Sequence, residues 1–313
     1  MRIYHLNCGT LRSFITTGLL GTGTLRNPPP LITHCLLVAT AAGLLLVDTG
    51  FGTRDYTHPT PIVRIFTAFN KYRHDLKETA IRQITRLGYD PADVKHIAVT
   101  HMHLDHVGGL PDFPHAKVHI YAEEYAGITH PHTIEERFVC RREHWEHRPD
   151  WAIHHLGDDQ WFGFDRTQPN KFGDTEFFLV PLTGHTRGNS AVVVLTPDGW
   201  LMHCGDTYIY HGDVHPEKPF CPPHYISTLS VMGLMAPAFR VFGKHSPRLR
   251  QLIREHGDEV QIFCSHDHHE FARLRAQNVT QSQKRRGVGN VKKGAAYDGI
   301  LSSHTPSETP AAA

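Results

Sequence analysis

Apolar runs in the first half of the chain have the length and composition of buried strands. Two of them, Cys35–Val38 and Leu44–Asp48, are separated by a short Ala-Ala-Gly segment, which predicts a hairpin. Apolar residues then recur at helical spacing from about residue 75 to 87, and a glycine follows them, so a helix is expected there. Two further strands are predicted at 94–100 and 117–121.

The second half of the chain repeats this order of elements. Predicted strands at 191–195 and 200–203 flank a Pro-Asp-Gly turn. A helix is expected to start at Ser246 as its cap and to end at Gly257, and a strand at 260–264 follows. Two halves of similar order indicate an α+β fold, a four-layer αβ/βα sandwich of two mixed β-sheets with helices on the outer faces.

The domain organisation follows from a change of composition along the chain. Residues 1–276 are expected to form a single domain, with an insertion at about 127–171 that is rich in Arg, His, Trp and Pro. Two interpretations of the insertion stay open: an ordinary helical insertion, or an aromatic lid that contributes to a substrate pocket. Residues 277–313 are polar with few large apolar side chains, so a disordered, solvated tail is expected.

Composition narrows the class of protein. The 32 Lys and Arg residues nearly balance the 31 Asp and Glu residues, which argues against a nucleic-acid partner. The six cysteines form no C-x-x-C pair and are expected to be buried free thiols. The longest apolar stretch, Leu36–Val47, is too short to span a bilayer. No secretory signal is visible, so no membrane association and a cytoplasmic location are expected. The sequence predicts no oligomeric state.

The most unusual polar segment directly follows the predicted strand at 94–100. It reads His-Met-His-Leu-Asp-His over residues 101–106, and two glycines follow shortly afterwards. Three imidazoles and a carboxylate at the end of a buried strand are tolerable when a cation neutralises and organises them. The segment therefore predicts a metal site.

Three other polar residues stand at or near the ends of predicted strands: His185, Asp206 and His266. Each alone is more often a satisfied histidine or a turn residue, but strand ends on one edge of a sandwich can converge. Imidazole and carboxylate ligands together suit zinc or another first-row divalent ion. The combined set has enough ligands for two metal ions if one carboxylate bridges: His101, His103, Asp105, His106, His185, Asp206 and His266.

These residues and their order resemble the metallo-β-lactamase fold superfamily. The matching motifs span roughly residues 30–270 and are VDTG at 47–50, HMHLDH at 101–106, GH at 184–185, GD at 205–206 and SH at 265–266. The resemblance implies one metal held by His101, His103 and His185. It implies a second metal held by Asp105, His106 and His266, with Asp206 as the bridge. It also implies that Asp48 orients a ligand histidine from behind. Zn²⁺ is the expected metal at both positions, with iron or manganese as alternatives.

A pair of divalent ions about 3.5–4 Å apart can share a water and lower its pKa towards about 7. The resulting hydroxide would attack a small-molecule carbonyl substrate, and Asp105 would take the proton and pass it to the leaving group. The sequence thus predicts a metal-dependent hydrolase, with a lactone or ester as the favoured substrate. In lactonase members of the superfamily a tyrosine shortly after the bridging aspartate contacts the substrate. Here Tyr208 and Tyr210 flank the corresponding Ile209, so either is a candidate, with plain packing as the alternative.

Other functions stay open on the same residues. They are a thioesterase of the glyoxalase II type, an iron-dependent persulfide dioxygenase and a non-catalytic metal-dependent binding protein. Asp206 stands where some true β-lactamases have a cysteine ligand, which weighs against antibiotic hydrolysis. The near-zero net charge weighs against the RNA-processing nucleases of the superfamily. Cys204 could approach the site, although a buried thiol is the simpler interpretation.

Overall fold

The structure is a computed structural model that describes residues 1–235 and 242–285. The chain divides into two units, Met1–Arg275 and Ala276–Ala313. Everything below on sheets and site concerns the first unit. Of the segment expected to be a disordered tail, residues 277–285 continue the last helix, and residues 286–313 lie outside the described residues.

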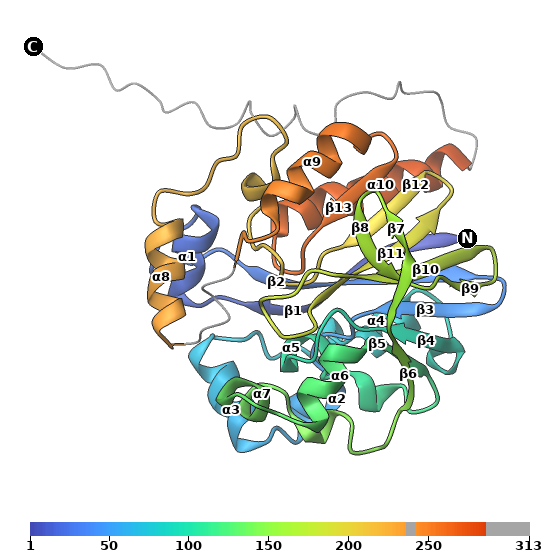
Figure 1. Cartoon of the computed structure of the whole chain (residues 1–313). Helices are drawn as coiled ribbons and strands as arrows, with labels where there is room; N and C mark the ends of the chain where they lie inside the picture. Colours follow the sequence, from blue (N-terminus) through green and yellow to red (C-terminus); the bar gives the residue numbers. More distant parts are fainter. Residues whose placement is uncertain (236–241, 286–313) are drawn as a thin grey trace, which may run out of the picture. The chain divides into compact units, whose positions relative to one another are not determined.

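Two mixed β-sheets form the centre of the first unit (Figure 1). The first sheet has the order β1-β2-β3-β4-β5-β6, antiparallel among β1 to β3 and parallel from β3 to β6. Its strands are β1 Arg2–Leu11, β2 Leu31–Thr40, β3 Gly43–Val47, β4 Val94–Ala98, β5 Lys117–Tyr121 and β6 Asp150–His154. The predicted hairpin and the strand at 117–121 are confirmed.

The second sheet has the order β13-β12-β11-β10-β9, with β12 and β13 parallel and the other pairs antiparallel. Its strands are β9 Asn170–Phe172, β10 Thr175–Pro181, β11 Ser190–Thr196, β12 Gly199–His203 and β13 Val260–Phe263. A separate hairpin joins β7 Leu156–Trp161 to β8 Phe164–Thr167. The strands predicted in the second half are therefore confirmed.

Helices flank the two sheets, as expected for this fold class. Figure 1 shows α4, α5 and α6 against the first sheet and α9 and α10 beside the second. The helices are α1 Phe14–Leu20, α2 Thr53–Thr57, α3 Pro61–Phe69, α4 Ala80–Arg86, α5 Leu104–Val107, α6 Ala122–Thr129, α7 Ile134–Phe138, α8 Tyr225–Met235, α9 Ser246–His256 and α10 His268–Arg285. Short 3₁₀ helices occupy Leu76–Glu78, Pro91–Asp93, Leu110–Asp112, Arg142–His144 and His211–Val214.

Two helix predictions need correction in detail. The helix expected over 75–87 is broken at Thr79, whose backbone is extended between the 3₁₀ turn and α4. The hydroxyl of Thr79 donates to the carbonyl of Leu76, and such local side-chain bonds compete with a continuous helix. The residue that caps α9 is His245, and Ser246 is already helical, a shift of one residue.

The core explains why β2 and β3 read as continuous apolar runs. Leu36 and Val38 pack with Phe177 and Val192 of the second sheet in one buried cluster. The alternate residues of the same strands, such as Leu37, belong to a second cluster that includes residues of α4 and α5. Because both faces of these strands are buried, both side-chain sets are apolar.

The segment at 127–171 is more β-rich than a helical insertion. It contains α7 and also β6, which extends the first sheet, and the hairpin β7–β8. Trp145 and Trp151 pack against the cluster under the first sheet. These two aromatic side chains therefore contribute to the core.

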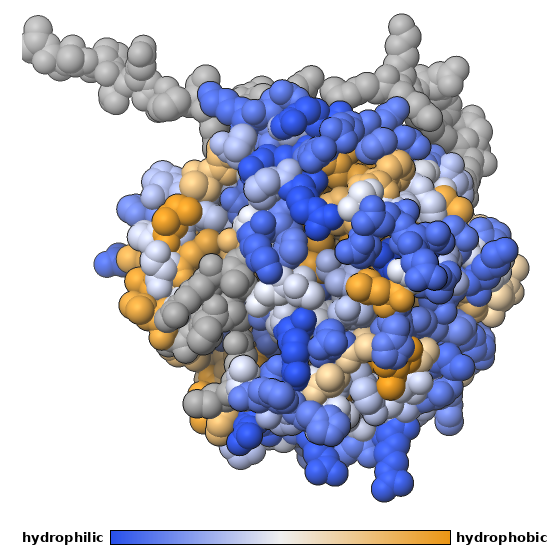
Figure 2. All heavy atoms as spheres, viewed as in Figure 1, coloured by the Kyte–Doolittle hydropathy of each residue, from blue (hydrophilic) through white to orange (hydrophobic). Residues whose placement is uncertain are grey.

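The surface is mostly hydrophilic in the face that Figure 2 shows, with apolar side chains gathered over α1 and α8. The large apolar residues exposed on α8 are Ile226, Val231 and Leu234. Within the described residues, no helix combines the length and the apolarity needed to cross a bilayer. All six cysteines are free as predicted, and Cys221 is exposed while the other five are buried.

Candidate metal centre

The seven predicted ligands converge although they come from four separate segments. His101 to His106 follow β4, His185 lies between β10 and β11, and Asp206 and His266 follow β12 and β13. Within the described residues, three sets have ligand atoms within 4.8 Å of one another. They are His101 with His103 and His185, His101 with His106 and Asp206, and Asp105 with His106 and His266. The first and last sets are the two groups that the sequence predicts.

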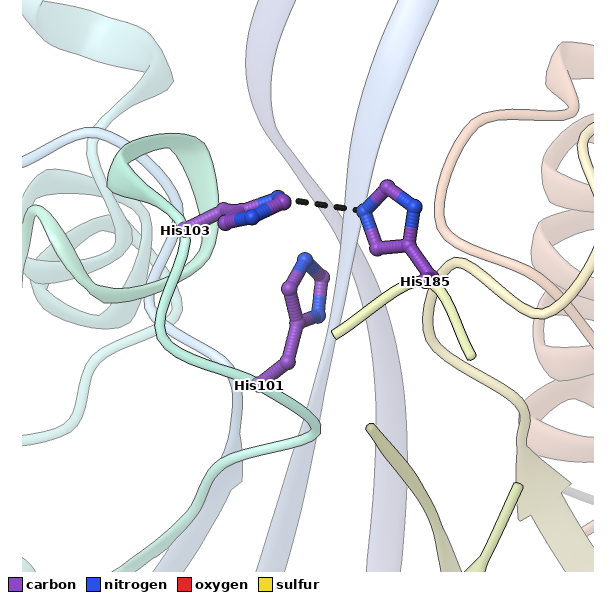
Figure 3. A group of neighbouring side chains, drawn as sticks. All are labelled: His101, His103 and His185. Atoms are coloured by element: carbon purple, nitrogen blue, oxygen red, sulfur yellow. Dashed lines mark hydrogen bonds between the residues drawn. The ribbon is translucent and has the colours of Figure 1, made fainter. Parts of the chain in front are cut away.

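The first group joins histidines from the ends of both sheets. Figure 3 shows the rings of His101, His103 and His185 turned toward one another, with Nε2 of His185 lying 3.1 Å from Nδ1 of His103. All three side chains are buried. Burial lowers the pKa of His101 and of His103 well below 6.5, so both rings are neutral at physiological pH. A neutral imidazole offers the lone pair that a metal ion requires.

The second group combines two buried imidazoles with a carboxylate at its open side. Oδ1 of Asp105 lies 3.9 Å from Nε2 of His106, and Oδ2 lies 3.8 Å from Nε2 of His266. The side chain of Asp105 is 14% exposed, whereas that of His106 is fully buried. Asp105 therefore has access to solvent from within the group.

Asp206 lies between the two groups. Its Oδ2 is 3.2 Å from Nε2 of His185 in the first group and 3.1 Å from Nε2 of His266 in the second. Its Oδ1 is 3.4 Å from Nε2 of His106. Although burial alone would raise the pKa of Asp206, His266 and His106 outweigh it and hold the pKa well below 3.8. One ionised carboxylate thus contacts both groups, as a bridging ligand must.

The buried polar atoms of this cluster fit metal ions. Within the described part of the chain, Nε2 of His101 is buried and has no hydrogen-bond partner. A buried polar atom without a partner costs about 1–3 kcal/mol. Coordination by divalent ions would remove that cost, and the mixture of imidazole and carboxylate donors is the set that zinc prefers.

A second layer of contacts orients the ligand rings. Oδ2 of Asp48 accepts a hydrogen bond from Nδ1 of His106 at 2.9 Å and another from Oγ1 of Thr100 at 2.7 Å. Because Thr100 donates to Asp48, its oxygen accepts from Nδ1 of His101 at 3.0 Å. Nδ1 of His266 donates to the carbonyl of Ile32 at 2.7 Å. In each of these three rings Nδ1 is engaged outside the site, which leaves Nε2 for a metal.

The two predicted substrate-contacting tyrosines lie in buried surroundings. The hydroxyl of Tyr208 donates to Oε1 of Glu270 at 3.0 Å. Tyr210 belongs to an apolar cluster with Leu19 and Tyr225. Substrate contact by either tyrosine stays a prediction. The buried Sγ of Cys204 points to the carbonyl of Met202, and burial raises the pKa of this thiol, as for an inert core cysteine.

Sequence reasoning missed two buried carboxylates beside the ligands. Asp267 accepts hydrogen bonds from Nδ1 of His211 at 2.6 Å and from the backbone N–H of His211 at 2.7 Å, so it ties the segment after Asp206 to the His266 segment. Glu124 of α6 contacts both loops of the first ligand group. The only local signal for Asp267 is its place next to a ligand. Glu124 follows another glutamate, and the sequence cannot tell which of the two is buried.

A two-sheet sandwich with imidazole and carboxylate groups gathered at one edge is the architecture of a metal-dependent protein with its site at the strand ends. The model of the metallo-beta-lactamase superfamily matches residues 28–243, and the chain belongs to this superfamily.

Relatives support the same assignment. The chain is 36% identical over 273 residues to a probable metallo-hydrolase of Mycobacterium bovis, covering 85% of this chain and 80% of the relative. It is 26% identical over 241 residues to the N-acyl homoserine lactonase AttM of Agrobacterium fabrum, covering 74% and 85%.

Solved structures show the fold. An N-acyl homoserine lactone hydrolase with N-hexanoyl-L-homoserine at its catalytic metal centre is 18% identical with a TM-score of 0.53, covering 86% of this chain and 94% of its own. A probable metal-dependent hydrolase from Staphylococcus aureus is 17% identical with a TM-score of 0.56, covering 85% and 88%.

Proposed function

We propose that this protein is a dinuclear metal-dependent hydrolase of lactones or related esters, with N-acyl homoserine lactones as the first substrate class to test. The observation that carries the proposal is the place of Asp206, whose Oδ2 lies 3.1–3.2 Å from one histidine of each ligand group. The lactone preference draws on the AttM relative and on the surroundings of the site. Zn²⁺ is the proposed metal, because the donors are imidazoles and carboxylates.

The ligands have separate roles in this proposal. His101, His103 and His185 would hold one ion, and the group of Asp105, His106 and His266 would hold the other, with Asp206 shared. When bound, the two ions supply Lewis acidity, which lowers the pKa of water and polarises a carbonyl oxygen.

Asp105 is the proposed proton carrier. Its carboxylate is within 3.9 Å of His106 and is the partly exposed member of its group, so it can meet both water and substrate. It would take a proton from the attacking water and deliver it to the alkoxide oxygen that leaves when the lactone ring opens. This transfer needs a position beside the metals, because the carboxylate must reach both the water and the leaving oxygen.

An apolar cluster beside the first ligand group fits a substrate with an apolar acyl part. The ring of Phe242 lies 5.1 Å from the ring of His185, centroid to centroid. Phe242 also packs against the buried cluster that contains Leu20 and Ile209. An acyl chain that contacts the partly buried ring of Phe242 would lie beside His185. The position of the cluster supports a lactone or ester that carries such a chain.

The test combines metal analysis with a substrate panel. Protein loaded with Zn²⁺ is offered N-hexanoyl homoserine lactone, an aryl ester and a glutathione thioester, and acid release is followed with a pH indicator. We expect about two metal equivalents and lactone opening that a chelator abolishes and Zn²⁺ restores. Two bound equivalents with no turnover on any substrate would contradict the proposal. Turnover confined to the thioester would indicate a thioesterase, and one iron with oxygen uptake a dioxygenase.

The variant Asp105→Asn tests the proton carrier. We expect turnover to fall about 10²- to 10⁴-fold, the usual contribution of a positioned general acid or base. The exposed Asp258 provides the matched control Asp258→Asn, which should keep full activity. Metal content is measured on both variants, because only a variant that retains its metals reports on proton transfer. Retained turnover would exclude Asp105 as the carrier.

A further inference from the structure

The three histidines of the first ligand group come from two different sheets. His101 and His103 follow a strand of the first sheet, whereas His185 lies between two strands of the second. Their separation therefore depends on how two sheets are held together at this edge. Asp48 supports His106 directly and His101 through Thr100, and both of these histidines follow β4 of the first sheet.

One buried carboxylate connects the two loops. Oε1 of Glu124 accepts a hydrogen bond from the backbone N–H of Met102 at 2.7 Å, and Met102 stands between the two histidines of the first loop. Oε2 accepts from the hydroxyl of Thr186 at 2.6 Å and from the backbone N–H of Gly188 at 3.0 Å. Thr186 directly follows the ligand of the second loop. Glu124 thus holds residues adjacent to all three histidines.

The packing around Gly188 gives independent evidence of this close fit. A Cβ atom added to Gly188 would lie 2.1 Å from the backbone nitrogen of Glu124 and 2.6 Å from its Cα. The start of α6 is therefore pressed directly against the loop that carries His185. No larger side chain fits at 188 without moving that contact, so this loop and the helix are held in one fixed relation.

The chemistry of the contact requires a carboxylate. Glu124 is only 3% exposed and all three of its partners are donors. Burial raises its pKa, while the hydrogen bonds from Thr186, Met102 and Gly188 oppose that shift. A glutamine of the same length would turn its N–H₂ group toward at least one of these donors. Two buried donors that face each other form no hydrogen bond, so the two groups would move apart.

We propose that Glu124 is a positioning residue that fixes the separation of His185 from His101 and His103, and so sets the metal affinity of the first ligand group. The inference rests on the proposed metal centre. It assigns no contact between Glu124 and metal or substrate. Residues that hold metal ligands in place from behind change metal affinity about 10- to 100-fold when they are replaced.

The experiment measures Zn²⁺ affinity by competition with a chromophoric chelator, in the full chain and without substrate. For Glu124→Gln we expect one of the two equivalents to bind at least about tenfold more weakly, with the other close to wild type. The matched control is Glu123→Gln, at the exposed neighbouring position on the same helix, which should leave both affinities unchanged. With one equivalent of Co²⁺, the visible spectrum should differ from wild type in Glu124→Gln alone.

A milder variant keeps the inference testable if Glu124→Gln does not fold. Thr186→Val removes one of the three donors and keeps Glu124 in place. It should lower the Zn²⁺ affinity of the same equivalent by a smaller factor. In the Glu124→Gln background Thr186→Val should have no further effect, because the two residues act through one contact. If Glu124→Gln does not fold, the affinity of Thr186→Val decides by itself.

Three results would overturn the inference. They are unchanged affinities in a folded Glu124→Gln or Thr186→Val variant, an equal loss at both equivalents, and a wild type that binds fewer than two equivalents. The proposed function can fail separately. Two-site binding with the expected Glu124 effect but no turnover on any substrate would reject the hydrolase and keep the positioning role.

Discussion

Nδ1 of His106 donates a hydrogen bond to Oδ2 of Asp48 at 2.9 Å, although 58 residues separate them in the chain. Asp48 follows β3 directly and has a positive φ of 53°, a backbone conformation that aspartate adopts more readily than most residues. Both side chains are fully buried. The VDTG motif thus supplies the group that fixes the ring of His106, a predicted metal ligand.

Replacing this carboxylate by an amide should weaken the second ligand group. In Asp48→Asn one oxygen can still accept from the backbone N–H of Thr100, but an N–H₂ group faces donors on His106 and Thr100. We expect Zn²⁺ affinity to fall about 10- to 100-fold at the equivalent that His106 holds, with a smaller loss at the other through Thr100 and His101. The free energy of unfolding should fall by about 1–3 kcal/mol. Chelator competition and urea denaturation measure the two effects, with Asp258→Asn as control; wild-type affinity would contradict the role of Asp48.

Loss of the Asp206 carboxylate should weaken metal binding at both positions, because both ligand groups share it. Asp206→Asn takes away the negative charge that faces His185, His266 and His106. We expect elemental analysis to find fewer than two equivalents in this variant. Metal bound at a hundred times its Kd stabilises a fold by about 2.7 kcal/mol, so a chelator should lower the Tm of the wild type by more than that of the variant. An Asp206→Asn protein that retains both metals would refute the bridge.

Tyr208→Phe should lower stability whatever its role toward substrate. Burial, followed by the charge of Asp267, raises the pKa of Glu270 to about 7, and the Tyr208 hydroxyl is one of its donors. Removal of this hydroxyl should lower the free energy of unfolding by about 1–3 kcal/mol. The cost should be larger at pH 8 than at pH 6, since the lost bond is charge-assisted only when Glu270 is ionised.

Turnover measurements distinguish substrate contact from packing as the role of Tyr208 and Tyr210. If Tyr208 contacts substrate as predicted, kcat/KM per folded molecule falls together with the stability. A role in packing alone leaves kcat/KM unchanged. Tyr210→Phe, which retains the ring in its apolar cluster, is the matched comparison. Urea titration of both variants at pH 6 and pH 8 gives the stability, and unchanged stability of Tyr208→Phe would contradict the hydrogen bond to Glu270.

Acid should destabilise the fold below about pH 6.5 through buried neutral histidines. His119 lies between His96 and His154 on adjacent strands, with ring nitrogens 2.8 Å apart on both sides. Burial, and then the neighbouring histidines, lowers the pKa of His119 from 6.5 to about 3. As the pH falls below 6.5, His119 is protonated in the unfolded chain but stays neutral in the folded chain. Its contribution to stability is therefore complete above pH 6.5 and is lost as the pH falls toward 3.

The variant His119→Gln isolates this contribution. Between pH 6 and pH 4 the wild type should lose about 1.4 kcal/mol per pH unit through this group, in addition to other losses. The variant should show a slope smaller by that amount, even if it is less stable at pH 7.5. The exposed His155 gives the control His155→Gln, with an unchanged slope. Equal slopes for His119→Gln and wild type would show that His119 does not titrate as described.

The strands that sequence analysis found are those with a strong local signature. β2 and β3 are buried on both faces, so every position is apolar and the run is conspicuous. β7 is mostly exposed and reads as a polar segment, and β6 lies at the edge of its sheet within the segment for which a helical insertion and an aromatic lid were both open. An exposed or edge strand forms because its backbone finds a partner, and its side chains record little of that.

By itself the sequence determined which residues stand at the strand ends: the cluster at 101–106, His185, Asp206 and His266, with Asp48 at the end of β3. These are local features, set by apolar runs that stop at polar residues. Only the tertiary structure decided that Glu124, and not the exposed Glu123, joins the loops of the first group, and that the Tyr208 hydroxyl meets Glu270. Such contacts depend on how the two sheets and their loops pack, and packing brings together residues whose spacing in the chain carries no record of it.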